Sequence, residues 1–403
     1  MNKISIPQKL RRSIPALRNK VYFNYGGQGP LPQESLVSIF KTWEKIQELG
    51  PFTKDVWPFI SNEISRTKSL LASLYKVKPH QICLSENVTT GFVIALWGID
   101  FKSQDRIIIS DCEHPGIVAA CKEIAKQKNL KIDILRIKDI RNDFLDQDRL
   151  SFKILNLVKE IITKETKAFI ISHVLWNTGI EIPIRKIGEF LLKKQTPIYL
   201  LVDGAQSFGH INLQENINFT DIYAFTSHKW ALGPEGLGGV ILSERFLLKS
   251  TPSFVGWKSL KKEAGIYEEE INPYHNDARK FEIATSCTPL LSGLRSSLDI
   301  IQSEGSIEER NNYIKYLSRI FWENLNLNEY VFPILKEQPN NGIISFTLGN
   351  KESNLELFNA LNKKNIFIRM LEDSNWLRAC IHITSTEEEI KIISSEIKKM
   401  LSN

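Results

Sequence analysis

The sequence is poor in the features that mark disulfide-bonded, zinc-binding and membrane-spanning proteins. It has five cysteines, at positions 83, 112, 121, 287 and 380, and no CxxC pair. An odd number without such pairs favours neither a disulfide framework nor a zinc cage, and reduced thiols in a cytoplasm are the simplest interpretation. The N-terminus lacks the apolar stretch of a secretory signal, and runs such as GFVIALWGI are shorter than the roughly 20 residues that span a bilayer. We therefore expect a soluble cytoplasmic protein without a metal or a membrane partner.

The charge pattern also lacks a long block of one sign. The net charge of +6, from 52 basic and 46 acidic residues, is spread through mixed stretches such as KEIAKQKNLKID. This pattern argues against nucleic acid as a main partner. What the chain does have is 42% hydrophobic and 24% charged residues, as in an average soluble globular protein. At 403 residues it exceeds one ordinary core, so we expect two domains.

Short apolar runs alternate with longer amphipathic segments between residues 65 and 245. The runs expected to be strands are QICLS, RIIIS, KIDILRI, KAFIIS, IYLLV, DIYAFT and GGVIL. Because they are continuously apolar, they are typical of a mostly parallel sheet that is buried on both faces. Segments such as SFKILNLVKEIITKE have the apolar spacing of covering helices. The pattern predicts an α/β fold with a seven-stranded sheet in its large domain.

The pattern of apolar and polar residues changes after about residue 290. Longer helical segments there separate a few strands, GIISFTL, IFIRM and LRACIHI, which predicts a smaller α+β domain. We expect an N-terminal segment over residues 1–20 that packs on this small domain, a large domain over 21–290 and the small domain over 291–403. No Pro/Gly-rich linker separates the two domains, so we expect them to pack rigidly.

Polar residues follow several of the expected strands, where ligands bind in open α/β sheets. QICLS leads into ENVTTG, which places Thr89 and Thr90 at the start of an apolar helix. Free N–H groups and the helix dipole there suit a phosphate, although a simple N-cap also explains the threonines. RIIIS leads into DCEHPG, where His114 lies in a turn, either in solvent or as a flat ring against a ligand.

Two further strand ends supply a carboxylate and an amine. Asp203 ends IYLLV, with Gln206 three positions on, and Lys229 follows DIYAFT within TSHKWALGPEG. A buried carboxylate needs a cation, although an Asp that caps a turn is also common. An amine held out of water becomes nucleophilic. The order of these residues predicts a pyridoxal phosphate site: Lys229 for the aldehyde, Asp203 for the ring nitrogen, His114 stacked on the ring, Gln206 for the phenolic oxygen, and Ser227 and His228 near the phosphate.

With these residues in hand, the chain resembles fold-type I pyridoxal phosphate enzymes of the class V aminotransferase group. The matching stretches include FNYGGQGPLP, NVTTG, DCEHPG, SHVLWNTG, VDGAQSFGH, TSHKWALGPEGLGG and FEIATS, and within the group the combination is most similar to the L-cysteine/cystine C–S lyases. The resemblance implies a homodimer in which Thr285 reaches the phosphate of the neighbouring subunit's cofactor. It also implies cofactor contacts from Asn177 and substrate contacts near Gly27, Arg369 and Arg378.

The C-terminal segment RMLEDSNWLRAC separates two related activities. Cysteine desulfurases and selenocysteine lyases of this group pass sulfur to a cysteine on a mobile loop between the two strands that hold the substrate arginine. Here no cysteine lies between Arg369 and Arg378. We therefore expect β-elimination on L-cystine or L-cysteine, with both arginines binding carboxylates or one of them paired with Glu372 or Asp373. A desulfurase, an aminotransferase or epimerase, and a non-catalytic cofactor-binding protein are the alternatives.

Overall fold

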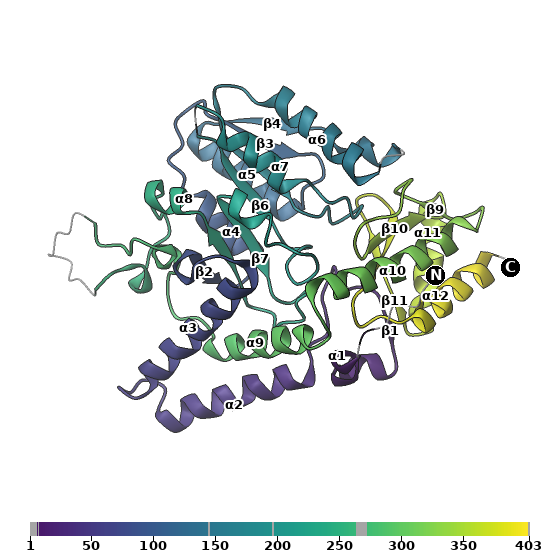
Figure 1. Ribbon diagram of the computed structural model, residues 1–403, viewed down its shortest axis with the longest axis horizontal. Helices are drawn as coiled ribbons and strands as arrows, with labels where there is room; N and C mark the ends of the chain where they lie inside the picture. The colour runs from purple at the N-terminus through teal and green to yellow at the C-terminus, as the bar shows by residue number, and fades with distance from the viewer. Residues whose placement is uncertain (1–5, 7, 144–145, 196, 263–271, 402–403) are drawn as a thin grey trace.

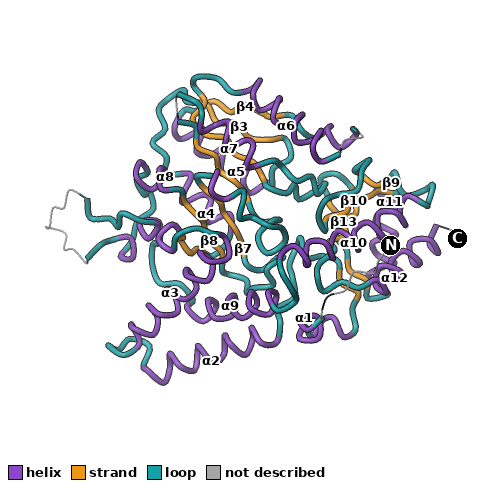
Figure 2. Tube along the Cα trace, viewed as in Figure 1, coloured by secondary structure: helices purple, strands orange, loops and turns teal. Residues whose placement is uncertain are grey.

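A seven-stranded sheet forms the centre of the larger part of the chain (Figures 1 and 2). This computed structural model describes residues 6, 8–143, 146–195, 197–262 and 272–401. The strand order is β2-β8-β7-β6-β5-β3-β4; β8 pairs antiparallel with β2 and β7, and the other pairs in this sheet are parallel. The strands are β2 (Ile82–Ser85), β3 (Arg106–Ser110), β4 (Lys131–Leu135), β5 (Thr166–Ser172), β6 (Tyr199–Asp203), β7 (Ile222–Thr226) and β8 (Gly238–Leu242). All seven coincide with the predicted apolar runs.

Each strand contributes alternate side chains to two separate apolar layers. In β5, Phe169 and Ile171 belong to one layer, whereas Ala168 and Ile170 belong to the other. This double burial is the reason that the strands are continuously apolar in sequence. One face is covered by α3 (Val56–Tyr75), α6 (Gln147–Ile161), α7 (Ile184–Leu192) and α9 (Thr288–Gln302), and the other by α4 (Val88–Leu96), α5 (Pro115–Lys128) and α8 (Glu244–Lys249).

The smaller part of the chain is built on a four-stranded antiparallel sheet in the order β12-β13-β10-β9. Its strands are β9 (Phe332–Pro333), β10 (Ile343–Thr347), β12 (Arg369–Leu371) and β13 (Trp376–Cys380), and its helices are α10 (Ile307–Asn326), α11 (Lys351–Lys363) and α12 (Glu387–Leu401). The prediction of one strand over IFIRM was wrong. It divides because β11 (Ile366–Phe367) pairs with β1 (Val21–Tyr22), whereas β12 pairs with β13.

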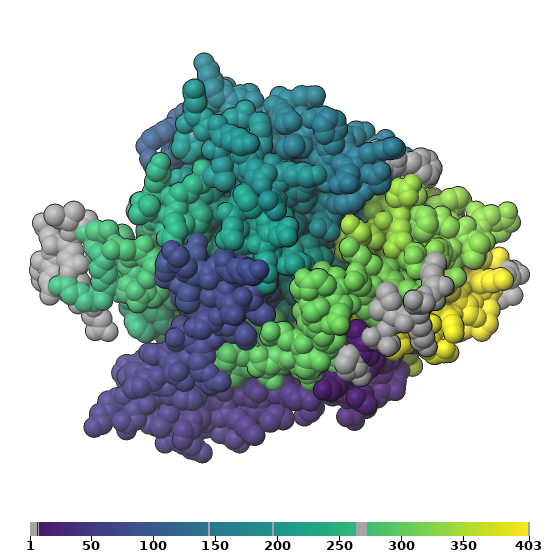
Figure 3. Space-filling view, in the orientation of Figure 1, coloured from purple at the N-terminus to yellow at the C-terminus, as the bar shows by residue number. Residues whose placement is uncertain are grey.

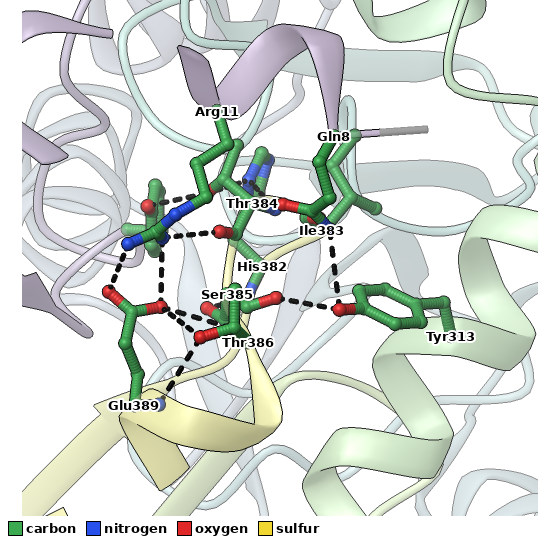
Figure 4. Close-up of polar contacts among 10 residues, drawn as sticks. Gln8, Arg11, Tyr313, His382, Ile383, Thr384, Ser385, Thr386 and Glu389 are labelled. Carbon is green, nitrogen blue, oxygen red and sulfur yellow. Dashed lines mark hydrogen bonds and ion pairs between the residues drawn. The ribbon is translucent and has the colours of Figure 1, made fainter. Parts of the chain in front are cut away.

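The N-terminal segment lies against the C-terminal part of the chain (Figure 3). In α1 (Lys9–Ser13), Arg11 forms two 2.9 Å hydrogen bonds with the Glu389 carboxylate at the start of α12 (Figure 4). Helix α2 (Gln33–Leu49) returns to the larger part and packs along α9, which spans residue 290. Among the described residues, no helix is both long and apolar enough to cross a membrane.

Candidate active site

Lys229 and Asp203 lie at the same edge of the large sheet, on neighbouring strands. Asp203 is the last residue of β6 and is paired in register with Ala224 of β7, five positions before Lys229. Asp203 is 5% exposed, and its Oδ1 accepts a 2.8 Å hydrogen bond from the Ala205 N–H. The strand order therefore brings the predicted carboxylate and amine into one site, as their order along the chain indicated.

Burial changes the acidity of the Lys229 amine. Removal of the ammonium group from water lowers the pKa of Lys229 to about 8; the charge of Asp203 opposes this shift and the Arg378 guanidinium adds to it. A lysine with this pKa has a substantial neutral fraction near neutral pH, and the neutral amine is the form that attacks an aldehyde or accepts a proton. Lys229 is thus prepared both for covalent attachment and for general base chemistry.

A cavity of about 710 Å³ surrounds Lys229 and collects most of the predicted site residues. The predicted residues that line it are Gly27, Thr89, His114, Asp203, Gln206, His228, Lys229, Arg369 and Arg378. They come from both parts of the chain, since Arg369 and Arg378 belong to β12 and β13. Among the described residues, no group of three or more His, Cys, Asp or Glu side chains could hold a metal ion.

The glycine-rich stretch FNYGGQGPLP passes over the loop that carries the lysine. The Gly29 N–H donates a 2.7 Å hydrogen bond to the His228 carbonyl, and a Cβ at Gly29 would lie 2.3 Å from the Lys229 carbonyl oxygen. A Cβ at Gly26 would lie 2.8 Å from Cys380 Sγ and 3.0 Å from Gln206 Oε1. These two glycines are required because the backbone approaches both the lysine loop and the cavity wall closely.

His114 is positioned at the start of α5. It is the N-cap residue, and its Nδ1 accepts a 3.2 Å hydrogen bond from the Gly116 N–H. Burial lowers the pKa of His114, and the positive charge of Lys229 lowers it further. The neutral ring meets the indole of Trp176 edge to face, with centroids 5.8 Å apart. His114 therefore presents an uncharged flat ring to the cavity, as stacking on a cofactor requires.

The N-terminus of α4 offers donors for an anion. Asn87 is the N-cap, and its Oδ1 accepts a 2.9 Å hydrogen bond from the Thr90 N–H. The Thr90 hydroxyl also donates to Asn87 Oδ1, at 3.2 Å, so Thr90 serves the cap while Thr89 lines the cavity. The N–H groups that a cap leaves free, together with the helix dipole, suit the phosphate predicted at this position.

Arg369 and Arg378 lie side by side, because they are directly paired in the antiparallel register of β12 and β13. Arg378 is 3% exposed; its Nη1 donates a 2.8 Å hydrogen bond to the Trp176 carbonyl, while its buried Nε has no partner. Arg369 is exposed at the cavity mouth. The buried Arg378 Nε–H, close to Lys229, is therefore a donor without an acceptor. A carboxylate bound in the cavity would supply the acceptor.

Four predicted cofactor contacts lie outside the cavity wall: Thr90, which serves the cap of α4, and also Asn177, Ser227 and Thr285. The Ser227 hydroxyl donates to the Pro234 and Leu237 carbonyls, so it holds the loop after Lys229 together. Asn177 is buried and its Oδ1 has no partner, whereas its neighbour Trp176 lines the cavity. Thr285 is exposed on the surface of the single chain. The roles of these residues stay predictions.

Several residues of the site were missed from the sequence. Asn24, just before the glycine pair, lines the cavity with a buried Oδ1 that has no partner. Glu113 lies behind the wall and accepts a 2.6 Å hydrogen bond from the Ser172 hydroxyl, and burial raises its pKa to about 7. Both residues stand inside stretches that were singled out, FNYGG and DCEHPG. In both cases the sequence could have indicated them, because each is a polar residue within a stretch that already contained a predicted site residue.

The fold and the site together define a class of protein. The site fits pyridoxal phosphate group by group. A desolvated lysine and a buried aspartate lie at adjacent strand ends of a mostly parallel sheet, and a flat neutral histidine and a capped helix N-terminus lie beside them. The unpaired Asn24 Oδ1 and Arg378 Nε in the same cavity are consistent with a polar ligand there. The protein is a pyridoxal phosphate-dependent enzyme of fold type I.

The chain belongs to the class-V aminotransferase family, whose model matches residues 59–393. It is 34% identical to the cystine C–S lyase C-DES in a complex with cysteine persulfide, with a TM-score of 0.88 over 95% of this chain and 98% of that one. A mutant of C-DES with glycine covalently linked to its PLP cofactor gives 34% identity and a TM-score of 0.87, over 96% and 98% of the two chains. A probable cysteine desulfurase of Pyrococcus abyssi is 20% identical over 99% of this chain and 98% of its own length. The enzyme therefore has carbon–sulfur lyase and cysteine desulfurase homologues.

Proposed function

We propose that the protein is a carbon–sulfur lyase that performs β-elimination on L-cystine and L-cysteine, giving pyruvate, ammonia and persulfide or sulfide. The observation that carries this proposal is the pair Arg369 and Arg378, which lie in direct register and line the same cavity as Lys229. Two guanidinium groups match the two carboxylates of cystine. The likeness to a cystine C–S lyase supports the same substrate.

The two arginines divide the binding of the substrate. Arg378 is buried and influences the pKa of Lys229, so it binds the α-carboxylate of the reacting half. Its Nη1 is already held by the Trp176 carbonyl, which leaves Nε and Nη2 for the carboxylate. Arg369 lies exposed at the mouth and binds the carboxylate of the distal half. The reacting half is thereby oriented with its α-carbon toward Lys229.

Lys229 moves the proton at the α-carbon. When bound, pyridoxal phosphate supplies an aldehyde for the amines and a ring that accepts electron density from the α-carbon. Lys229 would hold the aldehyde of the cofactor, and its neutral amine would also act as the general base that takes the proton from Cα. Asp203 would keep the ring nitrogen protonated, His114 would stack on the ring, and Thr89 with the N-terminus of α4 would bind the phosphate. The bond from Cβ to sulfur then breaks.

Sulfur transfer to an enzyme cysteine is not supported by the arrangement of the thiols. No cysteine is among the described residues that line the cavity, and β12 and β13 are joined by a short turn without one. Cys380, at the end of β13, is fully buried, and burial raises the pKa of its thiol. A buried protonated thiol is a poor acceptor of sulfur, so the persulfide or sulfide leaves the enzyme.

A homodimer is also part of the proposal. Helix α2 exposes a stripe of apolar side chains, Val37, Phe40 and Trp43, which are 40%, 63% and 48% exposed. A second subunit would cover such a stripe and would bring its own Thr285, exposed in the single chain, toward the neighbouring cofactor.

The described cysteines are free thiols, which supports a reducing compartment such as the cytoplasm.

The substrate assignment is tested by pyruvate and sulfide release from cystine and cysteine. Cystine is expected to react faster, because a persulfide is a more acidic leaving group than a thiol. Arg369→Lys is expected to raise KM for cystine by about tenfold and to change KM for cysteine little, since cysteine has one carboxylate. Arg149→Lys, on the exposed start of α6, is the matched control. Faster turnover of cysteine, or an equal effect of Arg369→Lys on both substrates, would contradict the proposal.

A further inference from the structure

Trp230, the residue after Lys229, is a buried aromatic residue that is held at its ring, its indole N–H and its backbone carbonyl. It is 0% exposed, and its indole N–H donates a 2.8 Å hydrogen bond to Gln206 Oε1. An indole nitrogen is only ever a donor. The side-chain oxygen of Gln206 must therefore face Trp230, and the amide of Gln206 cannot rotate by 180° without placing two N–H groups against each other.

This constraint decides what Gln206 offers to the cavity. With its oxygen on Trp230, the amide nitrogen donates one hydrogen to the Gly26 carbonyl at 2.9 Å. The second amide hydrogen has no partner among the described residues, and Gln206 lines the cavity around Lys229. Gln206 therefore presents a donor, and a bound ligand must place an acceptor oxygen there. The phenolic oxygen of pyridoxal phosphate is such an acceptor.

We propose that Trp230 is a positioning residue, which fixes the amide of Gln206 as a hydrogen-bond donor toward the cofactor. The inference rests on the cavity around Lys229 being the cofactor pocket, and it does not depend on which sulfur amino acid reacts. Its energetic basis is that a flipped Gln206 would leave the indole N–H and the Gly26 carbonyl both buried without partners.

His210 holds the Trp230 ring in place. The two rings are stacked with centroids 3.5 Å apart and planes at 4°. The Gly342 N–H donates to His210 Nε2 at 2.9 Å, so the ring proton is on Nδ1, which donates to the Gln206 carbonyl at 2.9 Å. His210 is therefore neutral and connects three points: the Trp230 ring, the backbone of Gln206 and the start of the small sheet.

His382 holds the backbone of Trp230. Its Nδ1 accepts from the Thr384 N–H at 3.3 Å, so its Nε2 carries the proton and donates to the Trp230 carbonyl at 3.1 Å. Figure 4 shows His382 next to Thr384, whose carbonyl accepts a 2.7 Å hydrogen bond from Arg11. Tyr25 stacks on His382 with centroids 4.4 Å apart. Trp230 is thus fixed at its ring, its indole N–H and its carbonyl.

The test is the pH dependence of the absorbance of the lysine-bound cofactor in the purified holoenzyme. Trp230→Phe keeps an aromatic ring against His210 but removes the N–H. A donor on the phenolic oxygen stabilises its negatively charged form, so the variant's absorbance midpoint is expected to rise by about one pH unit. Trp322→Phe is the control, because the buried Trp322 indole N–H has no partner in the part of the chain that the structure describes. Its midpoint should stay at the wild-type value.

A double-mutant cycle separates this role from a merely structural one. Gln206→Met removes the donor directly and should raise the midpoint as much as Trp230→Phe, and the double variant should show no further shift. If Trp230→Phe does not fold, an unchanged midpoint in Gln206→Met alone overturns the proposal. A wild-type midpoint in Trp230→Phe, or additive shifts in the double variant, also overturns it. Borohydride reduction of the wild-type holoenzyme tests separately whether the cofactor is bound at Lys229. If it is bound elsewhere, the proposed function fails; if it is bound at Lys229 but the midpoint does not change in the variants, only the role of Trp230 fails.

Discussion

At the scale of single residues, the site depends on basic side chains whose pKa values burial lowers. Lys229 and His114 have lowered pKa values in the cavity, and behind it burial lowers the pKa of His210 to about 4 and that of His382 to about 3. The neutral histidines can each donate at one nitrogen and accept at the other, which the contacts around Trp230 require. A proton added to His210 would set a second donor against the Gly342 N–H.

His210→Asn is expected to destabilise the protein most at neutral pH. The folded-state pKa of His210, about 4, lies below the unfolded value near 6.5, so the wild type loses stability as the pH falls through this interval. The variant does not share this loss, and its destabilisation should shrink by about 1 kcal/mol between pH 7 and pH 5.5. Urea unfolding of the holoenzyme at both values measures it. His80→Asn, at an exposed histidine that bonds Glu244, should show no such decrease, and a pH-independent effect of His210→Asn would refute the neutral assignment.

At the scale of elements, each helix or loop start that faces the cavity delivers a functional group. Helix α4 presents its N-terminus and Thr89, α5 is capped by His114, and the turn after β7 presents Lys229. Parallel strands bring these starts to one edge, which is the physical reason that Thr89, His114 and Lys229 line one cavity.

Asn87→Ala is expected to weaken both α4 and cofactor binding. Loss of the N-cap costs about 1 kcal/mol of stability and releases the first turn that carries Thr89. Asn350 is a matched control, since it caps α11 in the same way by accepting from the Ser353 N–H at 2.8 Å, away from the cavity. Thermal unfolding and the dissociation constant of the cofactor should separate the two variants. Equal cofactor affinity in both would show that the α4 terminus does not bind the phosphate.

Much of this arrangement could be predicted from the sequence. The seven strands were found because burial on both faces makes them continuously apolar, and Lys229 and Asp203 were found because polar residues at the ends of such strands stand out. The contacts of Trp230 could not be found in this way. They join residues 206, 210, 342 and 382, whose proximity depends on how the two parts of the chain pack. The division of IFIRM likewise depends on the distant partners β1 and β13.

At the scale of the whole molecule, the active site exists only where the two parts of the chain meet. Lys229, Asp203 and the N-terminus of α4 belong to the large sheet and its helices, whereas both arginines come from the small sheet. Two early parts of the chain hold this junction together: α1 through Arg11 to α12, and the later glycine stretch through Gly29 to the lysine loop. Lys229 and the two arginines therefore reach one cavity from different parts of the chain.

The most direct test of the account is the covalent attachment of the cofactor to Lys229. Borohydride reduction of the purified enzyme followed by peptide mass spectrometry is expected to find the pyridoxyl group on the peptide that contains Lys229. Lys229→Ala should retain no covalently trapped cofactor and should lose at least about a thousandfold in turnover, because both the attachment and the general base are gone. Attachment at another lysine, or an alanine variant with wild-type turnover, would contradict the account.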